Sequence, residues 1–198
     1  MPKIVDHDQY RQELLSQSFD LFAKKGYASV TMRQLAEGLD VSTGTLYHYF
    51  PSKSVLFEQL IDQMSQQDML RATAELKDSQ TLTERIHIIG DFLAENEDYF
   101  LKQTYLVMDF YQHEDFEKIR HSTVFQKAYE RYQQTIADFI GISDPALIRF
   151  TLAHIDGLIL HRLYGNETFS MKEQVILLGD MLMLYLDSAL VTDKQEKV

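Results

Sequence analysis

Residues 31–50 hold the side chains whose types and spacing could do chemistry. Two short segments with apolar residues at helical spacing meet at residues 39–41, and Ala36 is small where two helices would cross closely. This pattern predicts a helix-turn-helix, in which the second helix enters the major groove of DNA. The exposed side chains of that second helix are small, hydroxylated or aromatic, and such groups suit base edges, thymine methyl groups and phosphates. They are Thr43, Gly44, Thr45, Tyr47 and His48.

Patterns for other chemistry are weaker. The chain has no Cys, which excludes disulfide scaffolds, thiol catalysis and Cys-based zinc sites. His154 and His161 could share a helix face, and residues 113–115 (His-Glu-Asp) form a cluster, but neither set has a recognised zinc spacing. We see no phosphate-binding glycine loop, nucleophile elbow or pair of catalytic carboxylates. We therefore expect no enzyme, no resident cofactor and no metal.

Helix signals recur along the whole chain and predict an all-α fold. Three Pro and eight Gly are too few for a turn-rich sandwich or barrel, and no segment alternates over the length of a strand. N-cap residues, capping boxes and an Asp-Pro pair mark helix starts. They stand at Asp8, Thr31, Ser42, Ser52, Thr81–Glu84, Asp144-Pro145 and Ser170–Glu173. They divide the chain into about nine helices, at roughly residues 8–25, 32–38, 42–49, 53–76, 82–97, 99–112, 115–140, 145–164 and 171–191.

The charge is distributed unevenly and suggests two functional parts. The net charge is −11, which is unusual for a protein that binds DNA. Residues 1–56 hold six basic and six acidic side chains, so the whole excess of negative charge follows residue 56. We predict a helix-turn-helix domain over residues 1–52, and a domain for effector binding and dimerisation over residues 53–198.

Residues 8–57 resemble the DNA-binding domain of the TetR family of transcriptional regulators. The resemblance rests on FAKKGY at 22–27, TMRQLA at 31–36 and VSTGTLYHYFPSK at 41–53. One departure is Asp40, where the family commonly has glycine, and we expect a small local strain there. Beyond residue 57 the resemblance lies only in length and helical character.

The resemblance implies roles for single residues on double-stranded operator DNA. It implies that Thr31 and Arg33 touch phosphate or an adjacent groove, and that Lys53 holds a phosphate together with helix amides. On the second helix of the motif, the threonines would face base edges, while Tyr47 and His48 would contact phosphate or lie partly in the core. We expect Tyr49 and Phe50 in the core. The predicted DNA-binding residues are Thr31, Arg33, Ser42, Thr43, Gly44, Thr45, Tyr47, His48 and Lys53.

Aromatic residues are concentrated between Phe92 and Phe150. One interpretation is a packed helical core, and another is a cavity for a hydrophobic or aromatic small molecule oriented by tyrosine hydroxyls. Carboxylates at Asp91, Glu95 and Asp109 would favour a cationic ligand if one faced inward, whereas a solvated helix face also explains them. The predicted pocket residues are Phe92, Tyr99, Tyr105, Met108, Phe110, Tyr111, Phe125 and Tyr129.

The last two predicted helices carry more apolar residues than one buried face needs. The final one has a stripe at Val175, Ile176, Leu178, Leu182, Leu186, Ala189 and Leu190, and further apolar residues at Met181, Met183, Leu184 and Tyr185. Because such a helix must be covered on more than one side, we expect a second subunit. The resemblance also implies a four-helix interface, and two-fold symmetry would place two recognition helices ~34 Å apart in successive major grooves. The predicted interface residues are Ile148, Leu152, Ile155 and Ile159.

We therefore expect a cytoplasmic homodimeric repressor that leaves its operator when it binds a small hydrophobic or aromatic effector. The longest apolar run, Met181–Leu186, is far shorter than the ~20 residues that span a bilayer, so no membrane role is expected. One alternative is a DNA-binding protein of this fold that responds to a protein partner. Another is a helical enzyme or adaptor that keeps the helix-turn-helix only as a scaffold.

Overall fold

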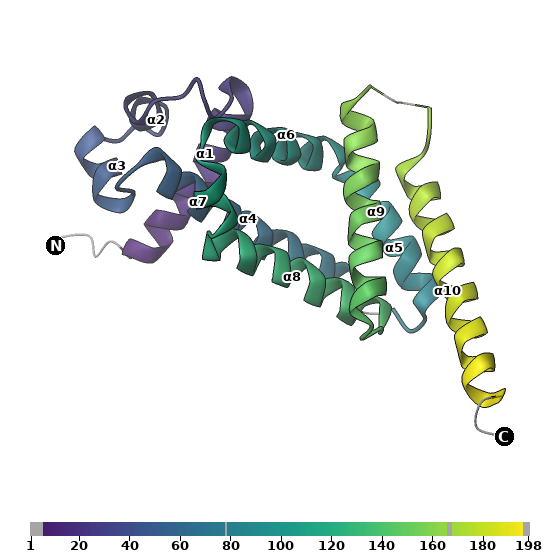
Figure 1. The fold of residues 1–198 in the computed structure, drawn as a ribbon. Coiled ribbons are helices and arrows are strands. Elements are labelled where there is room, and N and C mark those ends of the chain that lie inside the picture. Colours follow the sequence, from purple (N-terminus) through teal and green to yellow (C-terminus); the bar gives the residue numbers. More distant parts are fainter. Residues whose placement is uncertain (1–5, 78, 166–167, 196–198) are drawn as a thin grey trace. The chain divides into compact units, whose positions relative to one another are not determined.

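The structure is a computed structural model that describes residues 6–77, 79–165 and 168–195, with side chains up to residue 188. These residues form ten helices and no strand (Figure 1), so the predicted all-α class is confirmed. The helices are α1 His7–Lys25, α2 Met32–Gly38, α3 Thr43–Tyr49, α4 Lys53–Glu75, α5 Leu82–Glu95, α6 Glu97–His113, α7 Phe116–Arg120, α8 Thr123–Ile140, α9 Pro145–Leu163 and α10 Met171–Gln195.

The described helices number one more than predicted because the segment 115–140 is broken into α7 and α8. The backbone N–H of Ser122 donates to the carbonyl of Ile119 at 2.9 Å, which closes a tight turn after α7. The carbonyl of Ser122 then accepts the first hydrogen bond of α8, from Gln126 at 3.2 Å. Serine favours such helix boundaries because its short polar side chain competes with helical bonding.

Most predicted helix starts are confirmed, and one is corrected. Asp6, and not Asp8, caps α1, because its Oδ1 accepts from the backbone N–H groups of Asp8 at 3.0 Å and Gln9 at 3.1 Å. Asp8 instead lies in the first turn, where an acidic side chain is favourable. The side chains of the other predicted caps accept from backbone N–H groups as expected. These caps are Thr31, Ser42, Ser52, Thr81, Asp144 and Ser170.

The chain divides into two compact units. Unit 1 contains residues up to Leu70 and Lys102–Tyr132, and unit 2 contains Arg71–Leu101 and residues from Gln133 onward. Helices α4, α6 and α8 each contribute residues to both units. The functional boundary predicted after residue 52 lies inside unit 1 and stays a prediction.

A chain of buried aromatic rings forms the centre of unit 1. The ring of Phe57 in α4 lies 5.3 Å from Phe22 in α1, 4.9 Å from Tyr27 and 4.6 Å from Phe110 in α6, measured between centroids. All four side chains are buried, and such pairs add to the free energy gained from burying apolar area. This cluster therefore holds the end of α1 between α4 and α6.

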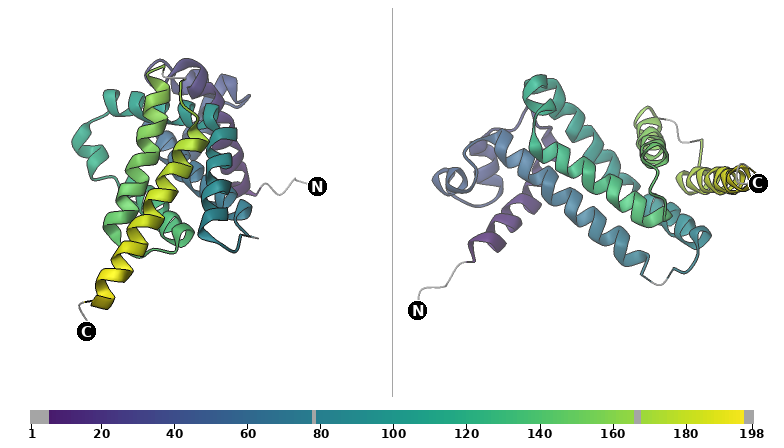
Figure 2. Two further views of the ribbon diagram at one scale, coloured as in Figure 1. Left: turned by 90° about the vertical axis from the view of Figure 1, so that its right-hand side faces the viewer. Right: turned by 60° about the horizontal axis from the view of Figure 1, so that its bottom comes forward.

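The core of unit 2 brings together α5, α9 and α10, with Phe100 of α6 added to it. Figure 2 shows α9 and α10 beside each other in both views. Helix α10 approaches α5 closely at Gly179, where a Cβ atom would lie 2.4 Å from Cδ1 of Ile86. The buried residues of this core include Ile86, Leu158 and Val175. Within the described residues, no helix has both the length and the hydropathy that crossing a bilayer requires.

Candidate nucleic-acid interface

Helices α2 and α3 form the predicted helix-turn-helix. At the start of α2, Oγ1 of Thr31 accepts from the backbone N–H of Gln34 at 3.3 Å, and Oε1 of Gln34 accepts from that of Thr31 at 2.9 Å. This reciprocal pair is a capping box. At the start of α3, Oγ of Ser42 accepts from the backbone N–H of Thr45 at 2.9 Å. Both helices therefore have fixed first turns.

The turn between the two helices contains the strained backbone that the sequence predicts. Asp40 has φ +54°, a left-handed conformation, and among the described residues it is the one non-glycine residue with positive φ. The next residue closes the turn, because the N–H of Val41 donates to the carbonyl of Ala36 at 2.9 Å. Aspartate tolerates this conformation better than most residues, so the turn keeps its geometry without glycine.

Burial separates the two faces of α3 as predicted. Leu46, Tyr49 and Phe50 are buried, which confirms the core positions expected for Tyr49 and Phe50. The side chains predicted to read DNA lie on the other face. Thr43, Gly44 and His48 are exposed, Tyr47 is 49% exposed, and Thr45 is half-buried. Thr31, Arg33 and Ser42 are exposed as well.

A contact that the sequence does not reveal joins α3 to the start of α1. The hydroxyl of Tyr49 and Nδ1 of His7 lie 2.7 Å apart, and the guanidinium of Arg11 lies over the tyrosine ring at 5.9 Å. The two partners are 42 positions apart in the chain, and no local pattern indicates them. This contact fixes the orientation of α3, and with it the exposed face.

Lys53 lies at the start of α4, and its ammonium already has partners. Nζ donates to the backbone carbonyls of Tyr27 at 2.8 Å and Ala28 at 3.4 Å, and it lies 4.2 Å from the centroid of the Tyr27 ring. Burial lowers the pKa of Lys53, while the charges of Glu114 and Asp109 act in the opposite direction. An ammonium has three N–H groups, so one stays available for a phosphate. The phosphate contact itself stays a prediction.

The sequence signature described as "Bacterial regulatory proteins, tetR family" matches residues 14–60, which include α2, α3 and the turn between them. Residues 14–60 are a TetR-family DNA-binding domain. The part of the chain that carries the family signature is therefore the part that forms the helix-turn-helix in the structure.

Solved structures of TetR-family fold cover most of the chain. A TetR-family transcriptional regulator from Mesorhizobium loti MAFF303099 has a TM-score of 0.73 at 14% identity, over 91% of this chain and 98% of that one. A transcriptional regulator from Saccharomonospora viridis, solved in complex with choline, has a TM-score of 0.70 at 21% identity, over 89% and 97%. At these identities the likeness shows the fold alone.

Curated relatives match beyond the DNA-binding part. Nucleoid occlusion factor SlmA of Haemophilus influenzae (strain PittGG) is 26% identical over 156 residues, which are 79% of this chain. The same match covers 62% of the relative, so the chain spans less than two thirds of its length.

The aromatic residues predicted to form an effector pocket belong to both units. Phe92 and Tyr99 belong to unit 2, and the other six belong to unit 1. Phe110 is fully buried among other rings, which matches the packed-core interpretation. The exposed ones are Tyr105, Met108, Tyr111 and Tyr129. Aromatic content alone does not distinguish a core from a cavity, and a pocket role for this set stays a prediction.

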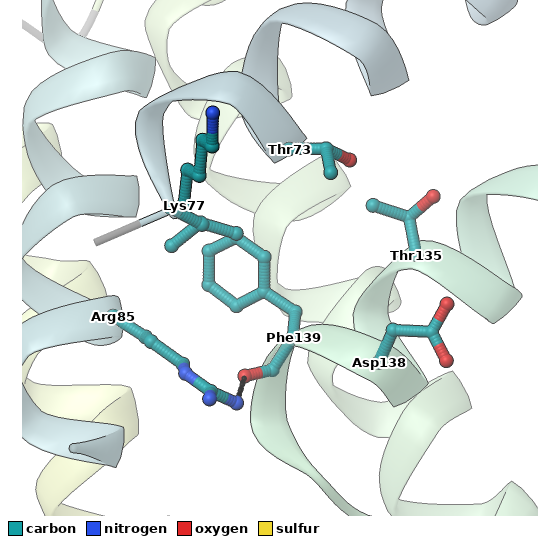
Figure 3. Close-up of a pocket in the computed structure, with 7 residues that line it drawn as sticks. Thr73, Lys77, Arg85, Thr135, Asp138 and Phe139 are labelled. Carbon is teal, nitrogen blue, oxygen red and sulfur yellow. Dashed lines mark hydrogen bonds between the residues drawn. The ribbon is translucent and has the colours of Figure 1, made fainter. Parts of the chain in front are cut away.

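A pocket of about 240 Å³ lies within unit 2 and has a different lining (Figure 3). Nη1 of Arg85 donates to the backbone carbonyl of Phe139 at 3.2 Å, beside the phenyl ring. Figure 3 shows the ammonium of Lys77 and the carboxylate of Asp138 pointing away from that ring. The lining residues are Thr73, Leu76, Lys77, Arg85, Thr135, Asp138 and Phe139. The lining combines polar and apolar side chains, and no sequence pattern indicated these residues.

The residues predicted for the dimer interface are buried or partly buried within the single chain, and their role in an interface stays a prediction. Ile148, Leu152 and Ile159 are buried. Ile159 belongs to the core of unit 2, and Ile155 packs against that core. The stripe on α9 is thus covered by the chain itself. The large apolar side chains that stay exposed on α9 and α10 are Phe150, Leu177, Met181, Leu184 and Tyr185. The side chains of Ala189 and Leu190 lie outside the described residues.

Proposed function

We propose that this protein is a homodimeric transcriptional repressor that binds operator DNA through α2 and α3. The observation that carries the proposal is the two-sided burial of α3. Leu46 and Tyr49 fix the helix in unit 1, while Thr43, Tyr47 and His48 stay exposed on its other face. These exposed side chains suit base edges, methyl groups and phosphates. The helix also lacks acidic side chains, which would repel phosphates.

The exposed apolar side chains of α9 and α10 support the homodimer. Large apolar side chains in one area of a surface mark interaction sites in proteins of this size. Leu184 is 71% exposed, and Phe150 is 51% exposed. A second copy of the chain would cover them with the same face, as a two-fold interface requires. Such a dimer would present two copies of α3 to half-sites one turn of DNA apart.

A small-molecule effector is the second part of the proposal. The Saccharomonospora viridis regulator of the same fold was solved in complex with choline, which supports a small-molecule ligand for a protein of this fold. In this chain, the lining of the pocket in unit 2 includes two basic side chains, one acidic side chain, two threonines and an aromatic ring. An effector would favour a state of the dimer with lower DNA affinity, and its effect is limited by its differential affinity for the two states.

Control by a protein partner is the second candidate function. Two observations favour it: the match to nucleoid occlusion factor SlmA over most of the chain, and the exposed aromatic residues of unit 1. Tyr105, Tyr111 and Tyr129 are large side chains that a protein surface could cover. Under this proposal, the helices beyond α3 would bind that partner in place of a small molecule.

Selection from a random pool of DNA duplexes tests the proposal. The purified protein should enrich inverted half-sites whose centres lie about 10 base pairs apart. A pool without an enriched sequence would contradict operator binding, and a single half-site would contradict the two-fold dimer. The selected duplex is then challenged with small hydrophobic and aromatic compounds. Release by a compound that also raises the unfolding temperature supports the effector, whereas release by a protein alone favours the second candidate.

A further inference from the structure

Two carboxylates at the end of α6 hold the turn that follows α1, within unit 1. The hydroxyl of Tyr27 donates to Oε1 of Glu114, which directly follows α6. The backbone N–H of Ala28 donates to Oδ2 of Asp109, in the last turns of α6, at 3.2 Å. The partners are 87 and 81 positions apart in the chain. Residues 26–28 are therefore held from a distant helix at two points.

Gly26 allows the carboxylate of Asp109 to come this close. Its φ is +80°, a conformation that side-chain-bearing residues rarely adopt, and a Cβ atom there would lie 2.9 Å from Oδ2 of Asp109. The same carboxylate group lies 3.1 Å from Nδ1 of His113, through its other oxygen. Residues 26–28 and the end of α6 are thus packed directly against each other.

Residues 26–28 also position Lys53, the predicted phosphate contact. Nζ of Lys53 donates to the carbonyls of Tyr27 and Ala28, the same two residues that the carboxylates fix. A continuous set of contacts therefore runs from α6 through residues 27 and 28 to the start of α4. If the turn moved, the ammonium would lose its two carbonyl partners.

The negative charges of Glu114 and Asp109 favour the protonated forms of Tyr27 and Lys53. Burial raises the pKa of Tyr27, and its hydrogen bond to Glu114 raises it further, so the hydroxyl stays protonated as the donor. Burial lowers the pKa of Lys53, and the negative charges of Glu114 and Asp109 oppose that effect. The two carboxylates thus favour the cation that a phosphate would need.

We propose that Asp109 and Glu114 are positioning residues for operator binding, because they fix residues 26–28 and, through them, Lys53. This inference rests on the proposed function, since it assumes that the helices beside these residues bind DNA. It makes two residues at the end of α6 determinants of DNA affinity.

A carboxylate near DNA also acts through its charge, and the two roles predict opposite signs. By charge alone, removing Glu114 should strengthen binding, because the protein repels phosphates less. If Glu114 positions Lys53, then Glu114→Ala should weaken binding of the selected duplex by roughly tenfold, the loss typical of a hydrogen bond to a charged group. It should also flatten the dependence of log K on log salt by about one unit, as losing one phosphate contact does.

Two further variants make the test sharp. Tyr27→Phe keeps the ring in its aromatic cluster and leaves the net charge unchanged, so it should weaken binding to a similar degree. The double variant, Tyr27→Phe with Glu114→Ala, should bind the duplex no more weakly than either single variant, because both substitutions remove the same hydrogen bond. Glu117→Ala is the matched control, because that exposed carboxylate lies on α7 and its removal changes the net charge equally. It should leave both affinity and salt slope unchanged or bind slightly tighter.

Hydrogen exchange at the Ala28 amide separates positioning from a general loss of stability. The amide should exchange faster in Glu114→Ala and Tyr27→Phe, while the unfolding midpoint stays high enough to keep both variants folded at the assay temperature. If both variants bind a duplex that the wild type also binds, with wild-type affinity and salt slope, this inference is wrong and the proposed function still stands. A wild type that enriches no duplex would overturn the proposed function, and the inference with it.

Discussion

The hydroxyl groups of Ser42 and Thr45 lie 2.7 Å apart at the start of α3. Ser42 also accepts from the backbone N–H of Thr45 at 2.9 Å, so one side chain caps the helix and holds the neighbouring threonine. Rotation of Thr45 is limited by this pair, and the side chain is half-buried. The residue is thereby fixed in one orientation before DNA binds, which is what reading a base edge requires.

Thr45→Ala should weaken binding of the selected operator more than binding of a random duplex. A lost base contact costs about 1–3 kcal/mol on the matched sequence, whereas binding to random DNA depends mainly on phosphate contacts. Titration of both duplexes at one salt concentration measures the two losses. Thr45→Ser is the control because it keeps the hydroxyl beside Ser42. Equal losses on both duplexes would remove the base-reading role of Thr45.

Lys53→Ala should weaken binding to every sequence and flatten the salt slope by about one unit. The reason is that an ammonium at the start of α4 contacts phosphates, which all sequences share. Titrations at four or more salt concentrations give the slope. Lys127→Ala, an exposed cation on α8, serves as the control for the loss of one positive charge. A slope that falls equally in both variants would argue against a phosphate contact at Lys53.

Most of the DNA-binding part could be predicted from the sequence because its signals are local. The caps at Thr31 and Ser42, the turn at Asp40 and the buried face of α3 each depend on residues within about ten positions. The contacts of His7 with Tyr49 and of Glu114 with Tyr27 join residues 42 and 87 positions apart, and no spacing indicates them. These long-range contacts determine where the predicted face points.

The sequence alone does not distinguish the face of α9 that packs in the chain's own core from a face that a second subunit would cover. On α9, apolar residues at Ile148, Leu152 and Ile159 show helical spacing, but the same spacing serves a chain's own core and a subunit interface equally. Only packing distinguishes them, and in the structure all three residues are buried within the single chain. The apolar side chains that a second copy could cover are therefore those that stay exposed on α9 and α10.

Leu184→Lys should convert the proposed dimer to a monomer. Its side chain is 71% exposed on α10, and a charge buried in an apolar interface is strongly unfavourable. Leu70→Lys on α4 is a matched control, because Leu70 is also 71% exposed but belongs to unit 1. Light scattering coupled to size-exclusion chromatography gives both masses. If Leu184→Lys stays dimeric while Leu70→Lys dissociates, the interface lies elsewhere than on α10.

The stability of the protein should fall above pH 10 in a manner that depends on Tyr27. Burial and the hydrogen bond to Glu114 raise the pKa of Tyr27 above its usual value of 10.0. Folding then favours the protonated form, so the stabilisation is complete below pH 10 and is lost as the pH rises through the raised pKa. Between pH 9 and pH 11, wild type should lose about 1.4 kcal/mol more free energy of unfolding than Tyr27→Phe. Urea unfolding at both pH values measures this difference, in which the effects of the other tyrosines cancel. An equal loss in the two proteins would mean that Tyr27 ionises as easily in the folded chain as in the unfolded one, and that Glu114 does not hold its hydroxyl.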